Sequence, residues 1–421
     1  MYSVGNKIVT VGNKFPERRV NTINFVVDGE KFPNPTTIID QRNFFYFESI
    51  GPETVIVNWG DGEIDSYTFG TDNTGGGYRI GWTADGSSTD RGLGGNSLAP
   101  VHIYSDGNTG QRNISFEFSS ISNISILDVE NISLFSFPEE LSLSKNLNSI
   151  KLEGVENIPF LPKSLEKNVS LKKLKLVNAF PQALDALPNS FFVSQLEELN
   201  VSGSFNLSDN ISSNFFKINQ IKDTLIRFEA GNCNIQSLPE SFKELINLDK
   251  LNIRGTDEIN NPELVEPLVL LRYLAIGLDD QVQNLPDFGN HNKLRTLFIG
   301  PLNPVLINQI PQKYIGLVSI TTFFNVLKTS VINDDNFDLF INSIYELVTV
   351  NAYLDPSTAG SQEEYPNKFR DVTYGDPELT QSGNIEAPPQ FVQGSNNGNP
   401  INQGQKIYVL VNNYGHTVTT S

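Results

Sequence analysis

The sequence contains one cysteine in 421 residues, Cys233, so no disulfide can form within the chain. It is also poor in positive charge, because 30 lysines and arginines stand against 48 aspartates and glutamates, for a net charge of −18. Nucleic acids and anionic membrane surfaces attract basic stripes. The charge balance therefore argues against both as partners.

Long apolar runs are missing as well. No stretch approaches 18 consecutive apolar residues, so we expect no transmembrane helix and no membrane insertion. The first twenty residues lack the apolar segment and the small-residue cleavage site of a secretory signal peptide. If Met1 is the natural start, export by the general secretory route is therefore not expected.

The common catalytic motifs are absent too. The chain has no G-x-S-x-G, no H-E-x-x-H, no P-loop and no C-x-x-C, and its three histidines, His102, His291 and His416, lie in different segments. We therefore expect no enzymatic activity, no cofactor and no bound metal. Two carboxylates brought together by folding could still hydrolyse a glycan, because such a pair is set in space and not in sequence.

What the sequence does have is a repeat. From Leu225 to Leu317 a period of 23 residues opens each time on an apolar-x-x-apolar-x-apolar triplet. The triplets are Leu225/Phe228/Ala230, Leu248/Leu251/Ile253, Leu271/Leu274/Ile276 and Leu294/Leu297/Ile299. The last two members are two residues apart, so a short strand would point both to one side. This period and pattern resemble the leucine-rich-repeat family.

The resemblance implies an α/β solenoid over residues 120–320, in which stacked units share one core and return over a helix-like or 3-10 arm. Nine triplets start at Ile121, Leu147, Leu171, Leu196, Leu225, Leu248, Leu271, Leu294 and Leu317. Cys233 holds the ninth position of its repeat, where the family often has Asn or Cys facing the inside of the turn. We interpret this cysteine as structural. Other repeats carry Val155, Ala179 or Ser204 there, which weakens an asparagine ladder.

Residues 21–119 have a strand-like pattern of short apolar runs bounded by turn residues. Their motifs are Trp59-Gly60-Asp61-Gly62, then His102 and Tyr104, then a closing run with Ile114, Phe116 and Phe118. These motifs resemble the PKD-type, immunoglobulin-like β-sandwich. The resemblance implies a tight turn at Asp61-Gly62 and a structural hydrogen bond from His102.

The sandwich would carry a long insertion at 70–100, rich in Gly, Ser, Asp and Asn. Loops of that length are uncommon. Its aspartates do not match the spacing of a Ca²⁺ loop. Tyr78 and Trp82 within it are candidates for stacking on a sugar or anchoring a protein partner, and the alternative is that they pack back on the sandwich.

The remaining segments are predicted as follows. Residues 1–20 are an N-terminal arm. Residues 321–355 form a C-terminal cap, with an amphipathic helix that carries Phe337, Phe340, Ile341, Ile344 and Leu347. Residues 356–421 form an extended arm, rich in Pro, Gly, Asn and Gln, that ends in a β-hairpin at Asn413–Gly415. Closing segments of this kind resemble those of surface and phage proteins of the Bacteroidetes.

Leucine-rich repeats present the strand side of the solenoid to their ligands. Outward positions before the most regular repeats include Lys151, Lys173, Lys175, Glu198 and Asn200. The candidate partner surface comprises Arg227, Glu229, Lys250, Asn252, Arg254, Tyr273, Thr296 and Phe298. The mixture of charges with few aromatics fits a recognition surface for a protein or a glycan, and equally a solvated face.

The sequence thus predicts a multidomain protein for recognition or adhesion without catalysis. The leading hypothesis is a bacteriophage virion component, on a tail fibre, baseplate or capsid surface, assembled in the host cytoplasm. Its partners would be a host-surface glycan or protein and other virion proteins. The alternatives are a bacterial cell-surface or secreted leucine-rich-repeat adhesin, and a glycan-active enzyme with a divergent site. A homo-oligomer is left open.

Overall fold

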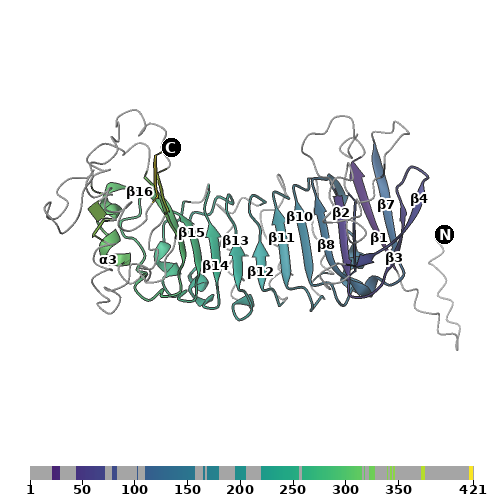
Figure 1. Ribbon diagram of the computed structural model, residues 1–421, viewed down its shortest axis with the longest axis horizontal. Helices are drawn as coiled ribbons and strands as arrows, with labels where there is room; N and C mark the ends of the chain where they lie inside the picture. The colour runs from purple at the N-terminus through teal and green to yellow at the C-terminus, as the bar shows by residue number, and fades with distance from the viewer. Residues whose placement is uncertain are drawn as a thin grey trace, which may run out of the picture.

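Strands dominate this computed structural model, standing side by side along the long axis of the molecule (Figure 1). The structure describes residues 21–28, 44–71, 78–82, 102, 110–156, 165, 168–179, 195–204, 220–255, 258–314, 317, 322–327, 339, 342–343, 345–346, 371–374 and 417–420. The predicted arm at 1–20, most of the 70–100 insertion and the hairpin at Asn413–Gly415 lie outside these residues.

Parallel strands form the central sheet. They are β8 (Ile124–Glu130), β10 (Ser149–Glu153), β11 (Lys173–Val177), β12 (Glu198–Asn200), β13 (Arg227–Glu229), β14 (Lys250–Ile253), β15 (Tyr273–Gly277), β16 (Thr296–Leu302) and β17 (Thr322–Leu327). Equivalent positions pair across neighbouring strands, so Leu251 lies beside Leu274 and Leu274 beside Leu297. These leucines are buried. The chain is therefore a solenoid of the leucine-rich-repeat type, as the triplets predict.

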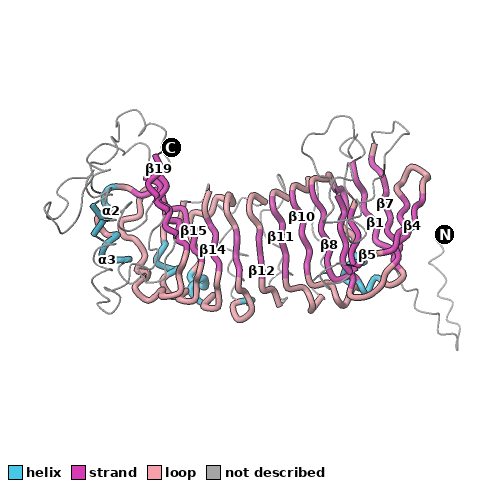
Figure 2. Tube along the Cα trace, viewed as in Figure 1, coloured by secondary structure: helices cyan, strands magenta, loops and turns pink. Residues whose placement is uncertain are grey.

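The return arms are shorter than an α/β solenoid requires. They contain the 3-10 helices η2 (Glu139–Leu143), η6 (Glu240–Glu244) and η7 (Pro262–Val265). The α-helices with assigned bounds among the described residues are α2 (Pro304–Ile307) and α3 (Ile310–Tyr314), at the end of the regular repeats (Figure 2). The α/β character is therefore not confirmed, because 23 residues leave room for little more than a strand and a 3-10 turn.

The strand register corrects both ends of the predicted solenoid. Ile150 pairs with Leu127 and Leu152 with Val129, so the first triplet starts at Ile124 and not at Ile121. Ile121–Asn123 forms instead the 3-10 helix η1. At the other end Leu297 pairs with Phe323, so the last triplet starts three residues after Leu317.

The last strand, β17, therefore occupies the beginning of the predicted cap at 321–355. The apolar residues of the predicted cap helix lie outside the described residues, although Leu339, Ser343 and Tyr345 between them are helical. The C-terminal strand β19 (Thr417–Thr420) pairs in parallel with β18 (Asp371–Tyr374). That pairing joins the C-terminal end of the predicted arm to residues 371–374 within it.

The N-terminal strands form two sheets with aromatic rings between them. One sheet has the order β4-β3-β7-β1-β9, from β4 (Ile64–Thr68), β3 (Thr54–Asn58), β7 (Gln111–Phe118), β1 (Thr22–Asp28) and β9 (Leu134–Ser136). The strands β2 (Phe44–Ser49), β6 (Tyr78–Gly81) and β5 (Gly70–Thr71) face it. Ring centroids of Phe25 and Phe45 are 4.9 Å apart, and those of Phe47 and Phe116 are 5.1 Å apart. These contacts join the sheets into one core.

No linker separates this N-terminal part from the solenoid. β2 pairs antiparallel with β8, so the strands β2, β6 and β5 continue the solenoid sheet. In return, β9 pairs with β1 of the other sheet. The predicted boundary near residue 120 therefore falls inside a shared structure. The PKD assignment itself stays a prediction.

A left-handed corner follows each of the first six strands of the solenoid. The eighth position of the repeat, counted from the corrected triplets, alternates between asparagine and glycine, and all six residues have positive φ: Asn131, Gly154, Asn178, Gly203, Asn232 and Gly255. A Cβ added to Gly203 would lie 2.0 Å from Oδ1 of Asn178. Each asparagine side chain thus fills the space beside the next glycine.

The ninth position supplies backbone contacts. The Cys233 thiol donates to the Val201 carbonyl at 3.2 Å, and the buried Ser204 hydroxyl donates to the Leu176 carbonyl. The structural role predicted for Cys233 is confirmed. Serine and cysteine here tie one turn to the preceding turn, in place of the asparagine ladder.

Replacing Gly203 with alanine should lower the free energy of unfolding by about 2–3 kcal/mol, since an L-residue at positive φ costs roughly 1–2 kcal/mol and the Asn178 amide must also move. Gly62, with φ +99° and no atom within 4 Å of an added Cβ, is the matched control for φ alone. Chemical denaturation should show G203A to be less stable than G62A, and N178G should restore part of the difference. Equal losses of stability in both variants would show that the Asn178 side chain adds no packing constraint at Gly203.

His291 is a buried titratable group in the repeat that opens at Leu271. Its side chain is fully buried against Phe288, with ring centroids 4.9 Å apart. Within the described part of the chain, neither ring nitrogen has a hydrogen-bond partner at normal geometry. Burial lowers the pKa of His291 below its usual 6.5, and the nearby Val265 carbonyl and Asp287 carboxylate oppose this shift without cancelling it.

The unfolded chain therefore binds a proton at His291 more readily than the folded chain. Stability should fall as pH drops below about 6.5 and continue to fall until the pKa of His291 in the folded chain is passed. Melting temperatures measured from pH 7.5 to 5 should decline less steeply in H291L than in the wild type. Parallel slopes for the two proteins would show that His291 does not contribute.

Candidate functional site on the strand face

The outward side chains of the central sheet form rows that cross the strands. One row contains Lys173, Glu198, Arg227, Lys250, Tyr273 and Thr296, which are paired in register from strand to strand. The next row contains Asp128, Lys151, Lys175, Asn200, Glu229, Asn252, Ala275 and Phe298. Because parallel pairing repeats every 23 to 29 residues, distant parts of the chain meet on one surface. We call this surface the strand face.

Charges occupy the β8–β10 end of the strand face. The ammonium of Lys151 contacts Glu130, lies 2.7 Å from Glu153 and 3.9 Å from Asp128. Burial disfavours the charged lysine, but the hydrogen bonds to Glu130 and Glu153 outweigh it and raise the pKa of Lys151. One cation therefore holds three carboxylates together.

The opposite arrangement lies in the middle of the strand face. The Glu198 carboxylate is 3.3 Å from Lys173, 3.6 Å from Lys175 and 3.2 Å from Arg227. Further along, Lys250 lies 3.0 Å from Glu229. Charges of both signs are thus paired across neighbouring strands.

Aromatic rings begin where these pairs end. Tyr273 and Phe298 lie on neighbouring strands with ring centroids 5.7 Å apart. The Lys250 ammonium is 5.2 Å from the centre of the Tyr273 ring, and the Arg254 guanidinium is 4.7 Å from the centre of the Phe298 ring. Both rings are half-buried, so part of each remains open to a partner.

The structure places the candidate residues of the solenoid on one surface. The two candidates in the insertion, Tyr78 and Trp82, lie apart from that surface. Arg227, Glu229, Lys250, Asn252, Arg254, Tyr273, Thr296 and Phe298 all lie on the strand face. Trp82 does not, because it is 4% exposed and packs edge-on against Trp59. Tyr78 begins strand β6 and packs against the same core. Of the two alternatives for Trp82, packing back on the sandwich is therefore confirmed and exposure on a partner-binding loop is wrong, because residues 78–81 pair with β2.

Sequence reasoning missed the acidic residues around Lys151. Asp128 and Glu130 lie on β8, whose triplet was predicted three residues too early, so their outward positions were not identified. The 23-residue spacing between Ile124 and Leu147, equal to the later repeats, is the signal that could have located them.

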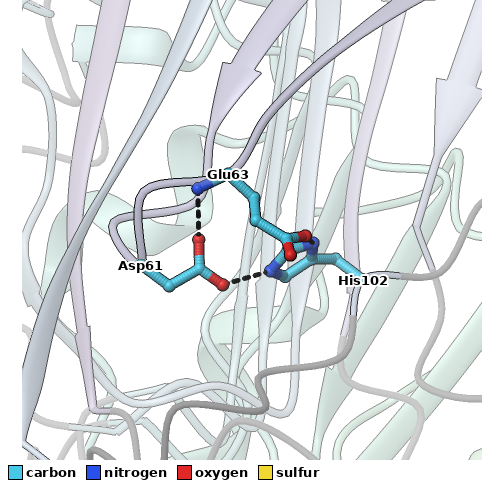
Figure 3. A group of neighbouring side chains, drawn as sticks. All are labelled: Asp61, Glu63 and His102. Atoms are coloured by element: carbon cyan, nitrogen blue, oxygen red, sulfur yellow. Dashed lines mark hydrogen bonds and ion pairs between the residues drawn. The ribbon is translucent and has the colours of Figure 1, made fainter.

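A separate cluster lies at the turn between β3 and β4, where ligand atoms of Asp61, Glu63 and His102 fall within 4.8 Å of one another (Figure 3). Nε2 of His102 is 2.8 Å from Oδ2 of Asp61, and Oδ1 of Asp61 accepts from the Glu63 backbone N–H at 2.9 Å. The His102 ring stacks on Trp59 with centroids 4.5 Å apart.

Both oxygens of Asp61 are therefore engaged in holding the turn closed. Burial acts to raise the pKa of Asp61, but the hydrogen bonds with the Glu63 backbone and with His102 outweigh it. The pKa of Asp61 is therefore lowered. The predicted structural hydrogen bond of His102 is confirmed. So is the predicted tight turn, in which Gly60 and Gly62 have positive φ.

Comparison with known proteins gives partial likenesses. No family model matches the chain. Human baculoviral IAP repeat-containing protein 1 is 29% identical over 136 residues, which cover 32% of this chain and 9% of that protein. The match thus spans less than a tenth of that relative.

Two bacterial proteins are among the solved structures with similar folds. A leucine-rich-repeat protein of Leptospira interrogans is 16% identical, with 59% of this chain and 72% of that chain covered and a TM-score of 0.31. Internalin C2 of Listeria monocytogenes is 15% identical, with 53% and 81% covered and a TM-score of 0.30. None of the helices within the described residues is long and apolar enough to cross a bilayer.

Proposed function

We propose that this protein is a non-catalytic recognition module whose strand face binds another protein. The observation that carries the proposal is the composition of that face, where paired charges over β8–β14 adjoin the Tyr273–Phe298 rings. Protein interfaces combine a few aromatic or arginine anchors with surrounding polar groups in the same way.

The rigidity of the frame supports the proposal. The outward side chains stand on hydrogen-bonded strands, and many of them are held by ion pairs. A partner would therefore meet a surface that is largely ordered beforehand, which reduces the entropy cost of binding. Ion pairs of this kind contribute more to orientation and specificity than to raw affinity.

The test places a bulky charge in the centre of the strand face. Asn200 is half-buried between Lys175 and Glu229, and N200R should exclude a partner that covers this region. The full chain is immobilised and exposed to an extract of the cells or particles that carry the gene, and bound proteins are quantified by mass spectrometry. We expect at least one protein to be retained by the wild type and reduced about tenfold or more by N200R.

The matched control is N292R, which makes the same substitution at an exposed corner outside the strand. It should retain the partner fully, and melting curves should show that both variants are folded. A partner captured equally by N200R would place the binding surface elsewhere and contradict the proposal.

The finer assignment is a bacteriophage structural component that binds a host-surface protein or glycan. It rests on the resemblance of the sequence to surface and phage proteins. Proteomic detection of the chain in purified particles would support it, and consistent absence from particles that contain the other structural proteins would remove it. A cell-surface or secreted adhesin is the alternative.

A further inference from the structure

Arg254 differs from the other cations of the strand face. Lys151, Lys173, Lys175, Arg227 and Lys250 each form an ion pair with a carboxylate of a neighbouring strand or of their own. Arg254 is exposed and forms no ion pair with any carboxylate of the described residues. In a chain of net charge −18, such a cation on a face of paired charges is unusual.

The position of Arg254 is set by packing. Its guanidinium lies over the Phe298 ring, which fixes the plane of the group without using its hydrogen-bond donors. In the strand register Phe298 lies between Ala275, a buried small residue at an outward position, and Phe324. The Tyr273 ring is tilted by 46° against the Phe298 ring, with centroids 5.7 Å apart.

These residues together make a two-part surface. Tyr273 and Phe298 offer a partly open aromatic shelf, and Arg254 offers a planar fork of N–H donors at its edge. A guanidinium fork matches the two oxygens of a carboxylate, and an aromatic shelf accepts an apolar or aromatic side chain. Such a pair of contacts suits adjacent residues of a peptide segment.

We infer that the strand face binds an acidic segment of its partner here, with an aspartate or glutamate on Arg254 and a neighbouring apolar or aromatic side chain on the Tyr273–Phe298 shelf. The inference rests on the proposed function and names the chemistry of the partner. The charge of Arg254, which no carboxylate of the described chain neutralises, is then neutralised in the complex.

The experiment selects ligands without presupposing the partner. A displayed library of randomised 12-residue peptides is selected on the immobilised full chain, and enriched peptides are synthesised for fluorescence polarisation. We expect aspartate or glutamate to be enriched beside an aromatic or aliphatic residue. R254Q should weaken these peptides about tenfold, the loss expected for a charge-assisted hydrogen-bonded pair. R254K should weaken them less, because it keeps the charge and loses the fork.

The matched control is R272Q, which neutralises another exposed arginine, one that pairs with Asp249 at the corner before β15. It should leave peptide affinity unchanged, and added salt should weaken wild-type binding more than R254Q binding. F298L, which keeps an apolar side chain but removes the ring, should lower affinity by an intermediate factor.

Two results would overturn the inference. One is a selection that enriches no acidic residues or no peptides at all, and the other is enriched peptides that bind R254Q as tightly as the wild type. The proposed function is tested by a different result. It is contradicted if N200R retains the captured partner. Loss of the partner in N200R with no effect of R254Q would keep the strand face and remove the acidic segment.

Discussion

The fold depends on a hydrogen-bonded sheet that must not end abruptly. One repeat cannot bury its own apolar face, so each repeat needs neighbours that cover its apolar residues. At the N-terminal end of the solenoid, no earlier repeat among the described residues pairs with β8, and β2 takes that place with antiparallel hydrogen bonds. The aromatic core around Phe45 and Phe47 then covers the end of the solenoid core. The N-terminal strands are therefore the cap of the solenoid as well as a structure of their own.

The sequence predicted the middle of the solenoid well and its ends less well, for a physical reason. From Leu225 to Leu294 a fixed period leaves only one frame in which apolar residues face inward. At the start, Ile121-x-x-Ile124-x-Ile126 and Ile124-x-x-Leu127-x-Val129 both satisfy the pattern. Local spacing cannot choose between them. Pairing with β10 does, because only the second frame places Leu127 and Val129 beside Ile150 and Leu152.

The candidate site was predictable in position but not in its interactions. Alternation along each strand places Arg227, Tyr273 and Phe298 outward once the register is known. Which carboxylate meets which cation depends on neighbours more than twenty residues away, so the sharing of Glu198 by three cations could not be foreseen.

For Trp82, in contrast, the position itself was not predictable from local composition. A Gly-rich composition suggested an exposed loop, whereas four residues of that stretch pair with β2 and carry the tryptophan into the core.

The distribution of charge along the strand face gives it two different ends. Over β8–β14 most charges are already paired, and exposed ion pairs contribute little free energy each. A partner that touches this part must replace those pairs or match them, so it is selected for its charge pattern. Around Tyr273 and Phe298 the face offers apolar area and the one cation of the described face that has no ionic partner. Under the proposed function, attraction would therefore be strongest at the β15–β16 end, and the paired charges would determine which orientations of a partner can extend from it across the sheet.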